Sequence, residues 1–340
     1  MRLRASARRL PLSQLLHECT AADCQQELHK RSSQYVTLLR SVPLPVKLHT
    51  VRARMLAKAE EVQALAQKAS TVADALRQAE DITNHAVDEL RDFNEPPWTS
   101  TNHTMQSLME WSFSELLAYR VLGQRHAELL PDANAGSLMV QADFPLDELL
   151  RDSIEDSRAF CREKFGDAPE VELKQLSEGA STLALALPAY IHFPLHELLK
   201  NSMGAHVRRI GPDRLDELPP IQVTFSVHDG WAGLEIADFG GGWKSPSGME
   251  ESALFLVTTN HGREPNYHYS RSFGSPFEGL GMGLPLAKLH ARYLGGNLQL
   301  NSLPGVGARA FVVFDASGMR TDAVCNGQWV QRWTREPEEH

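Results

Sequence analysis

Glu197 and Asn201 lie four residues apart in the stretch that begins at Pro194. On a helix this spacing places a carboxylate and a carboxamide on the same face. An amide oxygen can ligate Mg²⁺ without adding charge, and a carboxylate can orient or deprotonate an attacking hydroxyl. The pair therefore suits phosphoryl transfer, although the same pattern is also typical of a solvated helix face.

A second candidate group, Asp238 with Gly240 and Gly242, directly follows a predicted strand that ends at Ala237. A carboxylate at the end of a strand can accept a hydrogen bond from the amino group of a base. Glycines after it let the backbone approach that base closely. These residues predict the base-recognition part of a nucleotide pocket.

Two further glycine groups complete the set. Gly279-Leu-Gly281-Met-Gly283 runs straight into a predicted helix, whose N-terminal amides would bind phosphate oxygens, and Gly305-Val-Gly307 lies between the last two predicted strands. Each group alone is more typical of an ordinary turn. A Rossmann motif and a Walker loop are excluded, because the flanking strand pattern and the Gly-Lys-Ser/Thr sequence are missing.

The elements that must position these groups alternate between helices and strands. We expect strands where short segments are apolar or alternate in polarity: 171–173, 182–187, 221–227, 231–237, 297–302 and 308–314. Helices are predicted at 145–165, around Glu197, and at 284–294. Asp229-Gly230 predicts a hairpin. The C-terminal half is therefore predicted to be an α+β sandwich, with helices on one face of a mixed sheet.

The residues from Pro11 to about Leu130 are predicted to be helical. Val46 to Phe93 contains almost no helix breaker and predicts one long helix or two in line, and Thr101 to Leu130 predicts another. With a shorter pair before them, these helices predict a four-helix bundle. The small, polar residues from Pro131 to Ser137 predict a linker.

Composition narrows the class of protein. The chain has 340 residues, a net charge of −9 and four scattered cysteines without CxxC spacing. A dedicated nucleic-acid-binding protein is disfavoured, no membrane span is expected, and a reducing compartment is indicated. The first ten residues carry four arginines and no acid precedes Glu18, which predicts a mitochondrial presequence at 1–10, with an ordinary basic terminus as the alternative.

The four groups together resemble the nucleotide-binding motifs of the GHKL ATPase superfamily. More narrowly, Gly-Leu-Gly-Met-Gly-Leu-Pro at 279–285 and Tyr-Leu-Gly-Gly-Asn-Leu-Gln-Leu at 293–300 are similar to the mitochondrial kinases of pyruvate and branched-chain 2-oxoacid dehydrogenases. The resemblance is strong from about 190 to 314 and fainter before 140. It implies an all-α four-helix bundle followed by a GHKL/Bergerat-type α+β domain that binds ATP.

The resemblance also implies domains and roles. A bundle at 11–136 would serve docking and regulation, 138–316 would form the kinase domain, and 317–340 would be a tail. Glu197 would be the general base with Lys200 beside it, Asn201 would hold Mg²⁺, and Asp238 would read adenine. The remaining ATP-binding residues would be Gly240, Gly242, Thr258, Thr259, Gly279, Leu280, Gly281, Met282, Gly283, Leu284, Gly305 and Gly307. Residues 261–278 would form an ATP lid.

Several positions depart from the family pattern. Phe239 stands where arginine usually follows the aspartate, Gly204 replaces a frequent arginine, Ala308 replaces threonine, and Phe193 replaces a histidine. In the bundle, the family's Ser-Arg-x-x-x-Arg begins here with Glu115-Leu116 and keeps only Arg120, which puts an oxoacid-binding regulatory pocket in doubt. His126 is interpreted as a packed or solvated histidine rather than a phospho-acceptor.

The first hypothesis is a mitochondrial-matrix protein kinase that uses ATP and Mg²⁺ to phosphorylate a serine on the E1 subunit of a 2-oxoacid dehydrogenase. It would dock on the lipoyl domain of the E2 core, form a homodimer and bind no nucleic acid. The second hypothesis is a nucleotide-binding pseudokinase or regulator, favoured by Phe239, Gly204 and Ala308. A protein-histidine kinase or general ATPase is a third alternative.

Overall fold

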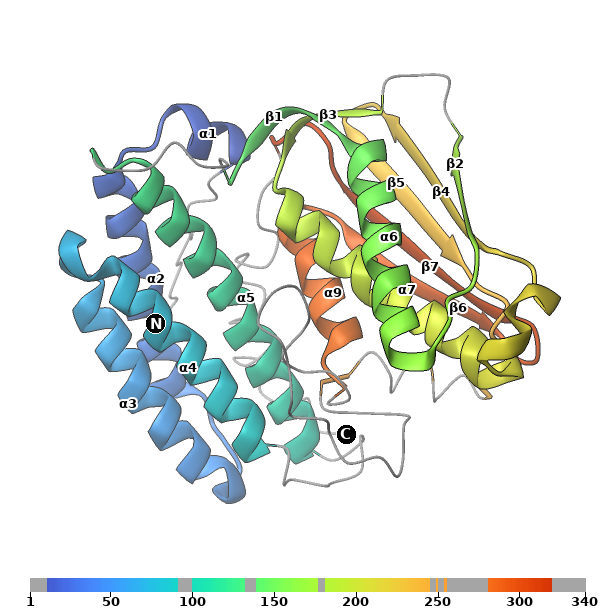
Figure 1. The fold of residues 1–340 in the computed structure, drawn as a ribbon. Helices are drawn as coiled ribbons and strands as arrows, with labels where there is room; N and C mark the ends of the chain where they lie inside the picture. The colour runs from blue at the N-terminus through green and yellow to red at the C-terminus, as the bar shows by residue number, and fades with distance from the viewer. Residues whose placement is uncertain are drawn as a thin grey trace, which may run out of the picture. The chain divides into compact units, whose positions relative to one another are not determined.

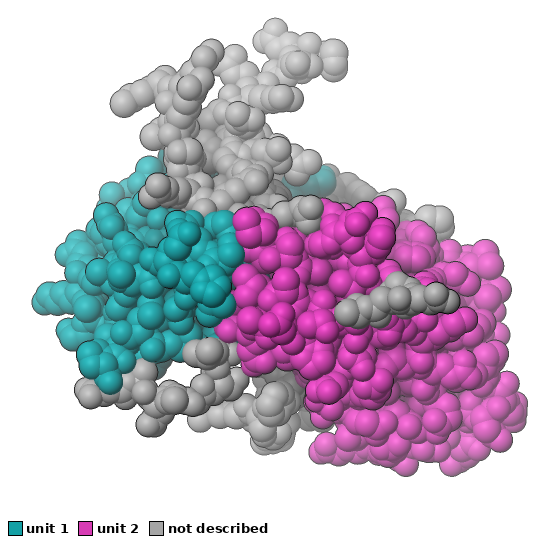
Figure 2. All heavy atoms as spheres, turned by 90° about the horizontal axis from the view of Figure 1, so that it is seen from above, with its two compact units in different colours: residues 1–139, 322–340 teal, residues 140–321 magenta. Residues whose placement is uncertain are grey.

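The structure, a computed structural model, describes residues 11–90, 100–131, 139–176, 181–244, 249, 254–255 and 281–319. The chain divides into two compact units, with the boundary between Met139 and Val140 (Figure 2). The described residues of the second unit end at Met319. Each unit is described below by itself.

The first unit is helical (Figure 1). A short helix precedes four long ones, and two 3₁₀ turns lie between them: α1 Leu12–His17, α2 Ala21–Ser41, η1 Val46–Leu48, α3 His49–Leu65, η2 Ala69–Thr71, α4 Val72–Leu90 and α5 Ser100–Glu128. Helix α2 contacts α3 and α5, and α4 contacts the same two helices. The four long helices therefore form a closed bundle. A four-helix bundle was predicted, but from a shorter pair of helices before residue 46 and two long ones after it, and the observed set differs.

The bundle encloses an apolar core. Its most deeply buried side chains come from each of the four long helices and include Leu28, Leu39, Met55, Val62, Ile82, Met109 and Phe113. Tyr35 of α2 packs against Trp111 of α5 with tilted rings whose centroids are 4.2 Å apart, and its hydroxyl donates to Ser112 Oγ at 2.9 Å. These contacts tie α2 to α5 at the centre of the unit.

The prediction of one helix, or two in line, from Val46 to Phe93 was wrong. The segment breaks after Leu65, and α3 and α4 lie side by side. Gln25 of α2 donates to the Ala66 and Gln67 carbonyls, and the Thr71 hydroxyl donates to the Leu65 carbonyl. These side chains satisfy the carbonyls that a helix end leaves without partners, so the chain can turn without glycine or proline.

The second unit is a mixed α/β structure. Its elements, in chain order, are β1 Gln141–Pro145, α6 Leu146–Phe165, β2 Val171–Gln175, β3 Thr182–Ala186, α7 Pro188–Ile210, η3 Pro212–Glu217, β4 Ile221–His228, β5 Trp231–Ala237, α9 Gly283–Tyr293, β6 Asn297–Leu303 and β7 Gly307–Asp315. Most of these elements agree with the predicted ones. The exception is β1, which pairs antiparallel with β3 in a separate two-stranded sheet and was not predicted.

The main sheet has five strands in the order β2-β4-β5-β7-β6. The β2–β4 pair is parallel, with Val171 opposite Ile221, and the other pairs are antiparallel. The β4–β5 hairpin turns at Asp229 and Gly230, which both have positive φ, as a tight hairpin turn of the predicted type requires. The sheet is therefore mixed, as the sequence predicted.

Helices α6, α7 and α9 lie on one side of this sheet (Figure 1). On β4, the inward residues Ile221, Val223 and Phe225 are buried while the residues between them are more exposed. The same alternation continues on β5 and β7. This single core holds α7 against the sheet, and α7 carries the predicted site.

None of the helices in the described ranges is both long enough and apolar enough to cross a membrane. Thr258, Thr259, Gly279, Leu280 and the predicted lid lie outside the described residues. The same holds for the predicted presequence, for nearly all of the predicted linker and for the tail beyond Met319.

Candidate functional site

Helix α7 is the element on which the site is built. It begins at Pro188, whose missing N–H costs nothing in the first turn, and it ends at Ile210, followed by Gly211 with a φ of +84°. Leu195, Leu198 and Leu199 are buried in the core of the unit. The helix therefore has little freedom to rotate about its axis.

Glu197 is only 3% exposed, and its carboxylate has two close neighbours. Oε1 accepts a hydrogen bond from Lys200 Nζ at 2.7 Å. Oε2 lies against the first residue of α9, since a Cβ built on Gly283 would be 2.2 Å from it. Any side chain at position 283 would displace the carboxylate, so this glycine is needed for close approach.

The start of α9 has the features of an anion site. Gly281 has a φ of +69°, and Met282, which precedes the helix, makes no side-chain hydrogen bond to the first turn. Leu284 is half-exposed, and Pro285 has no N–H to contribute. The backbone donors of the first turn and the helix dipole favour a phosphate group there.

Asp238 follows β5 and is held by three donors. Oδ1 accepts the backbone N–H of Gly240 at 2.8 Å and of Ala308 at 3.3 Å, and Oδ2 accepts the Ser202 hydroxyl at 3.2 Å. Burial raises the pKa of Asp238, and the hydrogen bonds partly oppose that rise. A carboxylate has about four acceptor positions, so Oδ2 keeps capacity for a ligand N–H.

Glycines bring the loops around Asp238 into contact. We call residues 239–243 the first glycine loop and residues 303–307 the second glycine loop. A Cβ on Gly307 would be 1.8 Å from the Asp238 carbonyl oxygen, and one on Gly240 would be 2.3 Å from the Ala205 Cβ of α7. Gly242 has a φ of +64°, and a Cβ there would be 2.6 Å from Ser302 Oγ. Close contact therefore requires glycine at each of these positions.

The structure thus brings predicted residues into two contact groups along α7. Glu197, Lys200 and Gly283 form one group. Asp238 lies in the other with the two glycine loops, which join through Gly305 N–H to the Gly241 carbonyl at 2.8 Å. On α7, Asn201 lies between Lys200 of the first group and Ser202, which binds Asp238 of the second, and Asn201 is exposed.

The polar groups of this site fit ATP with Mg²⁺. Asp238 can accept from an exocyclic amine, the start of α9 can donate to phosphate, and Asn201 offers an amide oxygen. Within the described ranges, no three His, Cys, Asp or Glu side chains come together in a way that could hold a metal ion. A magnesium site at Asn201 would therefore take its other ligands from phosphate oxygens and water, as Mg²⁺ often does.

Sequence reasoning missed three residues that position this site. Ser202 binds Asp238, His206 Nε2 accepts the Phe239 N–H at 2.9 Å, and Arg209 binds the glycine loops. Burial lowers the pKa of His206 to about 4, with the nearby Arg209 charge as a second cause. The three lie at positions i, i+4 and i+7 of α7, a spacing that places them on one helix face and that was visible in the sequence.

The positions that depart from the family pattern have definite surroundings. Phe193 stacks on His290 of α9 with ring centroids 4.4 Å apart. Gly204 is covered by Arg208, since a Cβ there would be 3.0 Å from Nη1. Ala308 still contributes its backbone N–H to Asp238. The substitutions therefore leave the contacts of Asp238 in place.

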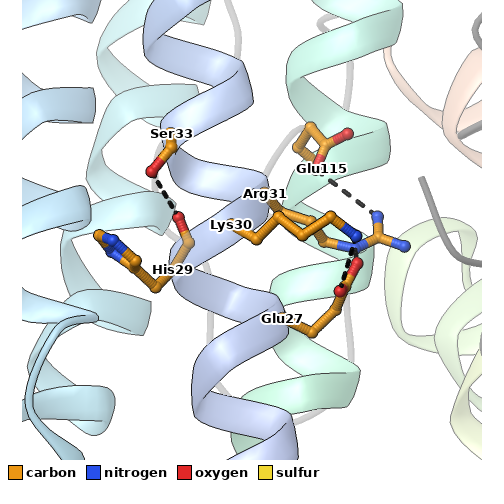
Figure 3. A network of polar contacts seen from close by, with 6 residues as sticks. All are labelled: Glu27, His29, Lys30, Arg31, Ser33 and Glu115. Atoms are coloured by element: carbon orange, nitrogen blue, oxygen red, sulfur yellow. Dashed lines mark hydrogen bonds and ion pairs between the residues drawn. The ribbon is translucent and has the colours of Figure 1, made fainter. Parts of the chain in front are cut away.

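In the first unit, Glu115 belongs to a charged cluster between α2 and α5 (Figure 3). Arg31, 4% exposed, lies 3.6 Å from Glu115 Oε2 and 3.4 Å from Glu27 Oε1, and Lys30 pairs with Glu27 at 3.1 Å. Arg120, predicted as the surviving family arginine, pairs instead with Glu80 of α4 at 2.9 Å. The carboxylates that these arginines face belong to the protein itself.

His126 of α5 is 3% exposed, and its Nε2 has no hydrogen-bond partner among the described residues. Burial lowers its pKa. Of the two interpretations, packed or solvated, the structure supports packed.

No family model matches the chain. Among curated proteins, it is 29% identical over 224 residues to the mitochondrial pyruvate dehydrogenase (acetyl-transferring) kinase of Drosophila melanogaster, covering 64% of this chain and 53% of that protein. Human isozyme 4 is 27% identical over 223 residues, with 64% and 53% covered. Human isozyme 3 is 27% identical over 234 residues, with 66% and 55% covered. The chain thus matches about half the length of these relatives.

A helical unit followed by an α/β unit with a mixed sheet is compatible with the two-domain architecture expected of such kinases. The chain is similar to the mitochondrial pyruvate dehydrogenase kinases, which confirms the resemblance predicted from its motifs.

Proposed function

We propose that this protein is an ATP-dependent protein-serine kinase of the mitochondrial matrix that phosphorylates the E1 subunit of pyruvate dehydrogenase. The observation that carries the proposal is the contact of Glu197 with Gly283 on one part of α7, and of Asp238 with Ser202 on another. The names of the relatives give the substrate. The proposed kinase domain is of the GHKL type and occupies residues 138–316, after a bundle at 11–136.

In this proposal each group has one role. Glu197 accepts the proton of the substrate serine hydroxyl, and Lys200 holds the carboxylate in place at 2.7 Å. Asp238 accepts from the base, and Asn201 ligates the metal. ATP supplies the phosphoryl group, while Mg²⁺ offsets the charge that develops during transfer.

The remaining nucleotide contacts are assigned by position. The start of α9, from Gly281 to Leu284, lies beside Glu197 and would bind phosphate. The two glycine loops would face the base and ribose. Thr258, Thr259, Gly279 and Leu280 complete the proposed set on the sequence resemblance alone, and so do the E2 lipoyl domain and homodimer as partners.

Labelled ATP and recombinant pyruvate dehydrogenase E1 test the proposal. The wild-type chain should label serine, and Glu197→Gln should reduce transfer by about 10²-fold or more while keeping nucleotide binding. Glu217→Gln is the matched control, since Glu217 is exposed and pairs only locally with Arg214. Acid-labile label would indicate phosphohistidine, and labelling of branched-chain E1 alone would change the substrate.

A nucleotide-binding regulator without transferase activity is the second candidate. The observation that favours it is the crowding of the Glu197 carboxylate, because Oε1 already accepts Lys200 Nζ and Oε2 lies against Gly283, which leaves little room for a substrate hydroxyl. Binding of MgATP without transfer to either E1 protein would support this second function.

A further inference from the structure

Arg209, near the end of α7, binds three backbone carbonyls, one in the first glycine loop and two adjacent ones in the second. Nη1 donates to the Phe239 carbonyl and, at 2.9 Å, to the Val306 carbonyl, and Nη2 donates to the Gly305 carbonyl at 3.1 Å. All three acceptors are neutral, and they come from both glycine loops. The planar guanidinium can reach several acceptors at once, which a lysine ammonium on a flexible stem cannot do in the same geometry.

The loops that Arg209 joins need such an anchor. Gly241 and Gly305 have positive φ values of +96° and +80°. The Gly305 N–H donates to the Gly241 carbonyl at 2.8 Å, and the Gly241 N–H donates to the Val306 carbonyl at 3.2 Å. Glycine backbones have more conformational freedom to lose than other residues. The side chain of Val306, at the tip of the second loop, is 46% exposed, so little apolar packing holds that tip.

His206, one turn earlier on the same face, supplies a second attachment. Its ring is fully buried and accepts the Phe239 N–H, so the same residue of the first glycine loop is held through its amide by His206 and through its carbonyl by Arg209. Asp238 immediately precedes Phe239. The position of the Asp238 carboxylate therefore depends on both attachments.

We propose that Arg209 is a positioning residue that fastens both glycine loops to α7 and so fixes the base-binding end of the nucleotide pocket. Arg209 makes no contact with the nucleotide in this role. It acts through Phe239, Gly305 and Val306 on the geometry of Asp238. The inference rests on the proposed nucleotide site for its functional consequence, but the fastening itself is a property of the free protein.

Hydrogen exchange on the 340-residue chain without nucleotide tests the fastening. Arg209→Ala should raise the exchange rates of the Gly241 and Gly305 amides about tenfold or more, because their bonds open more often. Arg209→Lys should behave like Arg209→Ala. Arg214→Ala is the matched control, an exposed arginine paired locally with Glu217, and should leave both rates unchanged. Equal rates in wild type and Arg209→Ala would overturn the proposal.

Kinetics with MgATP test the consequence. Arg209→Ala should raise the Kd and KM for MgATP about tenfold and leave kcat at saturating MgATP within about twofold of wild type. A fall in kcat with an unchanged KM would overturn the positioning role. If the wild-type chain fails to bind MgATP, the proposed function fails, whereas the exchange measurement still decides whether Arg209 fastens the loops.

Discussion

At the scale of single residues, the burial of Asp238 disfavours the charged form of its carboxylate. Burial raises its pKa, although Gly240, Ala308 and Ser202 donate to it. A raised pKa in the folded state means that the folded protein binds this proton more tightly than the unfolded chain does. Stability from this group is present at low pH and is lost as pH rises through the folded pKa.

Asp238→Asn should therefore separate stability from binding. At pH 7 the asparagine variant should have an unfolding free energy equal to or above that of wild type, and the difference should vanish below about pH 4. MgATP affinity should fall about 10- to 100-fold, because an amide nitrogen replaces one acceptor oxygen. Denaturant unfolding across pH and calorimetric titration measure the two effects, and a clear loss of stability at pH 7 would contradict this reading of Asp238.

At the scale of elements, the face of α7 that carries Ser202, His206 and Arg209 makes stability depend on pH through one residue, His206. The pKa of His206 is lowered to about 4 in the folded protein, so its neutral form is the one that folding stabilises. The unfolded chain binds this proton near pH 6.5. Stability from His206 is therefore complete above that pH and falls as pH drops toward 4.

The His206→Gln variant tests this. Wild type should lose on the order of 3 kcal/mol of unfolding free energy through His206 between pH 7 and pH 4. Glutamine can still accept the Phe239 N–H but does not titrate, so the variant should show a shallower loss over that window. His126, whose pKa burial also lowers, is present in both proteins and cancels in the comparison. Parallel curves for the two proteins would rule out the assignment.

Much of the second unit was predictable, because its strands alternate in polarity and its turns carry glycine. The end of α4 at Leu90 and the start of α5 at Ser100 were also predicted to within a few residues, whereas the break after Leu65 was not. That break depends on Gln25, which is distant in sequence and reaches the end of α3. Strand β1 contains Asp143, with a φ of +49°, and Pro145, so its sequence lacks a strand pattern.

The candidate site shows the same division. Residue types predicted which groups carry chemistry, and the glycine spacing predicted where backbones come close. The contacts of His206 and Arg209 with loops 30 to 97 residues away could not be predicted, because they depend on how α7 is rotated against the sheet.

At the scale of the whole molecule, each unit has its own core and its own charged interior. Arg31 is buried in the bundle and its partners Glu27 and Glu115 are half-buried, and all three are far along the chain from the proposed nucleotide residues. Burying charges costs free energy that the ion pairs only partly return, so such a cluster is sensitive to the loss of one partner.

Glu115→Ala should therefore destabilise the bundle by about 3 kcal/mol, since the buried Arg31 loses the carboxylate that lies 3.6 Å from its Nη1. Denaturant unfolding followed by Trp111 fluorescence measures the loss. Glu18→Ala, a change outside the bundle helices, is the control. MgATP affinity should stay within about twofold of wild type under native conditions, because this residue lies in the other unit. A matching loss of affinity would show that the bundle residue influences the nucleotide site.

The regular geometry of helix α7 also fixes where its functional side chains lie relative to one another. Glu197 and Arg209 are twelve positions apart, a rise of about 18 Å along the helix axis, and each successive side chain between them is rotated by about 100° about that axis. A substitution changes one side chain and leaves the direction of all the others unchanged. Deleting one residue between Leu198 and Ala205 would rotate His206 and Arg209 away from the glycine loops. Natural variation in this part of the helix should therefore consist of substitutions and not of insertions or deletions.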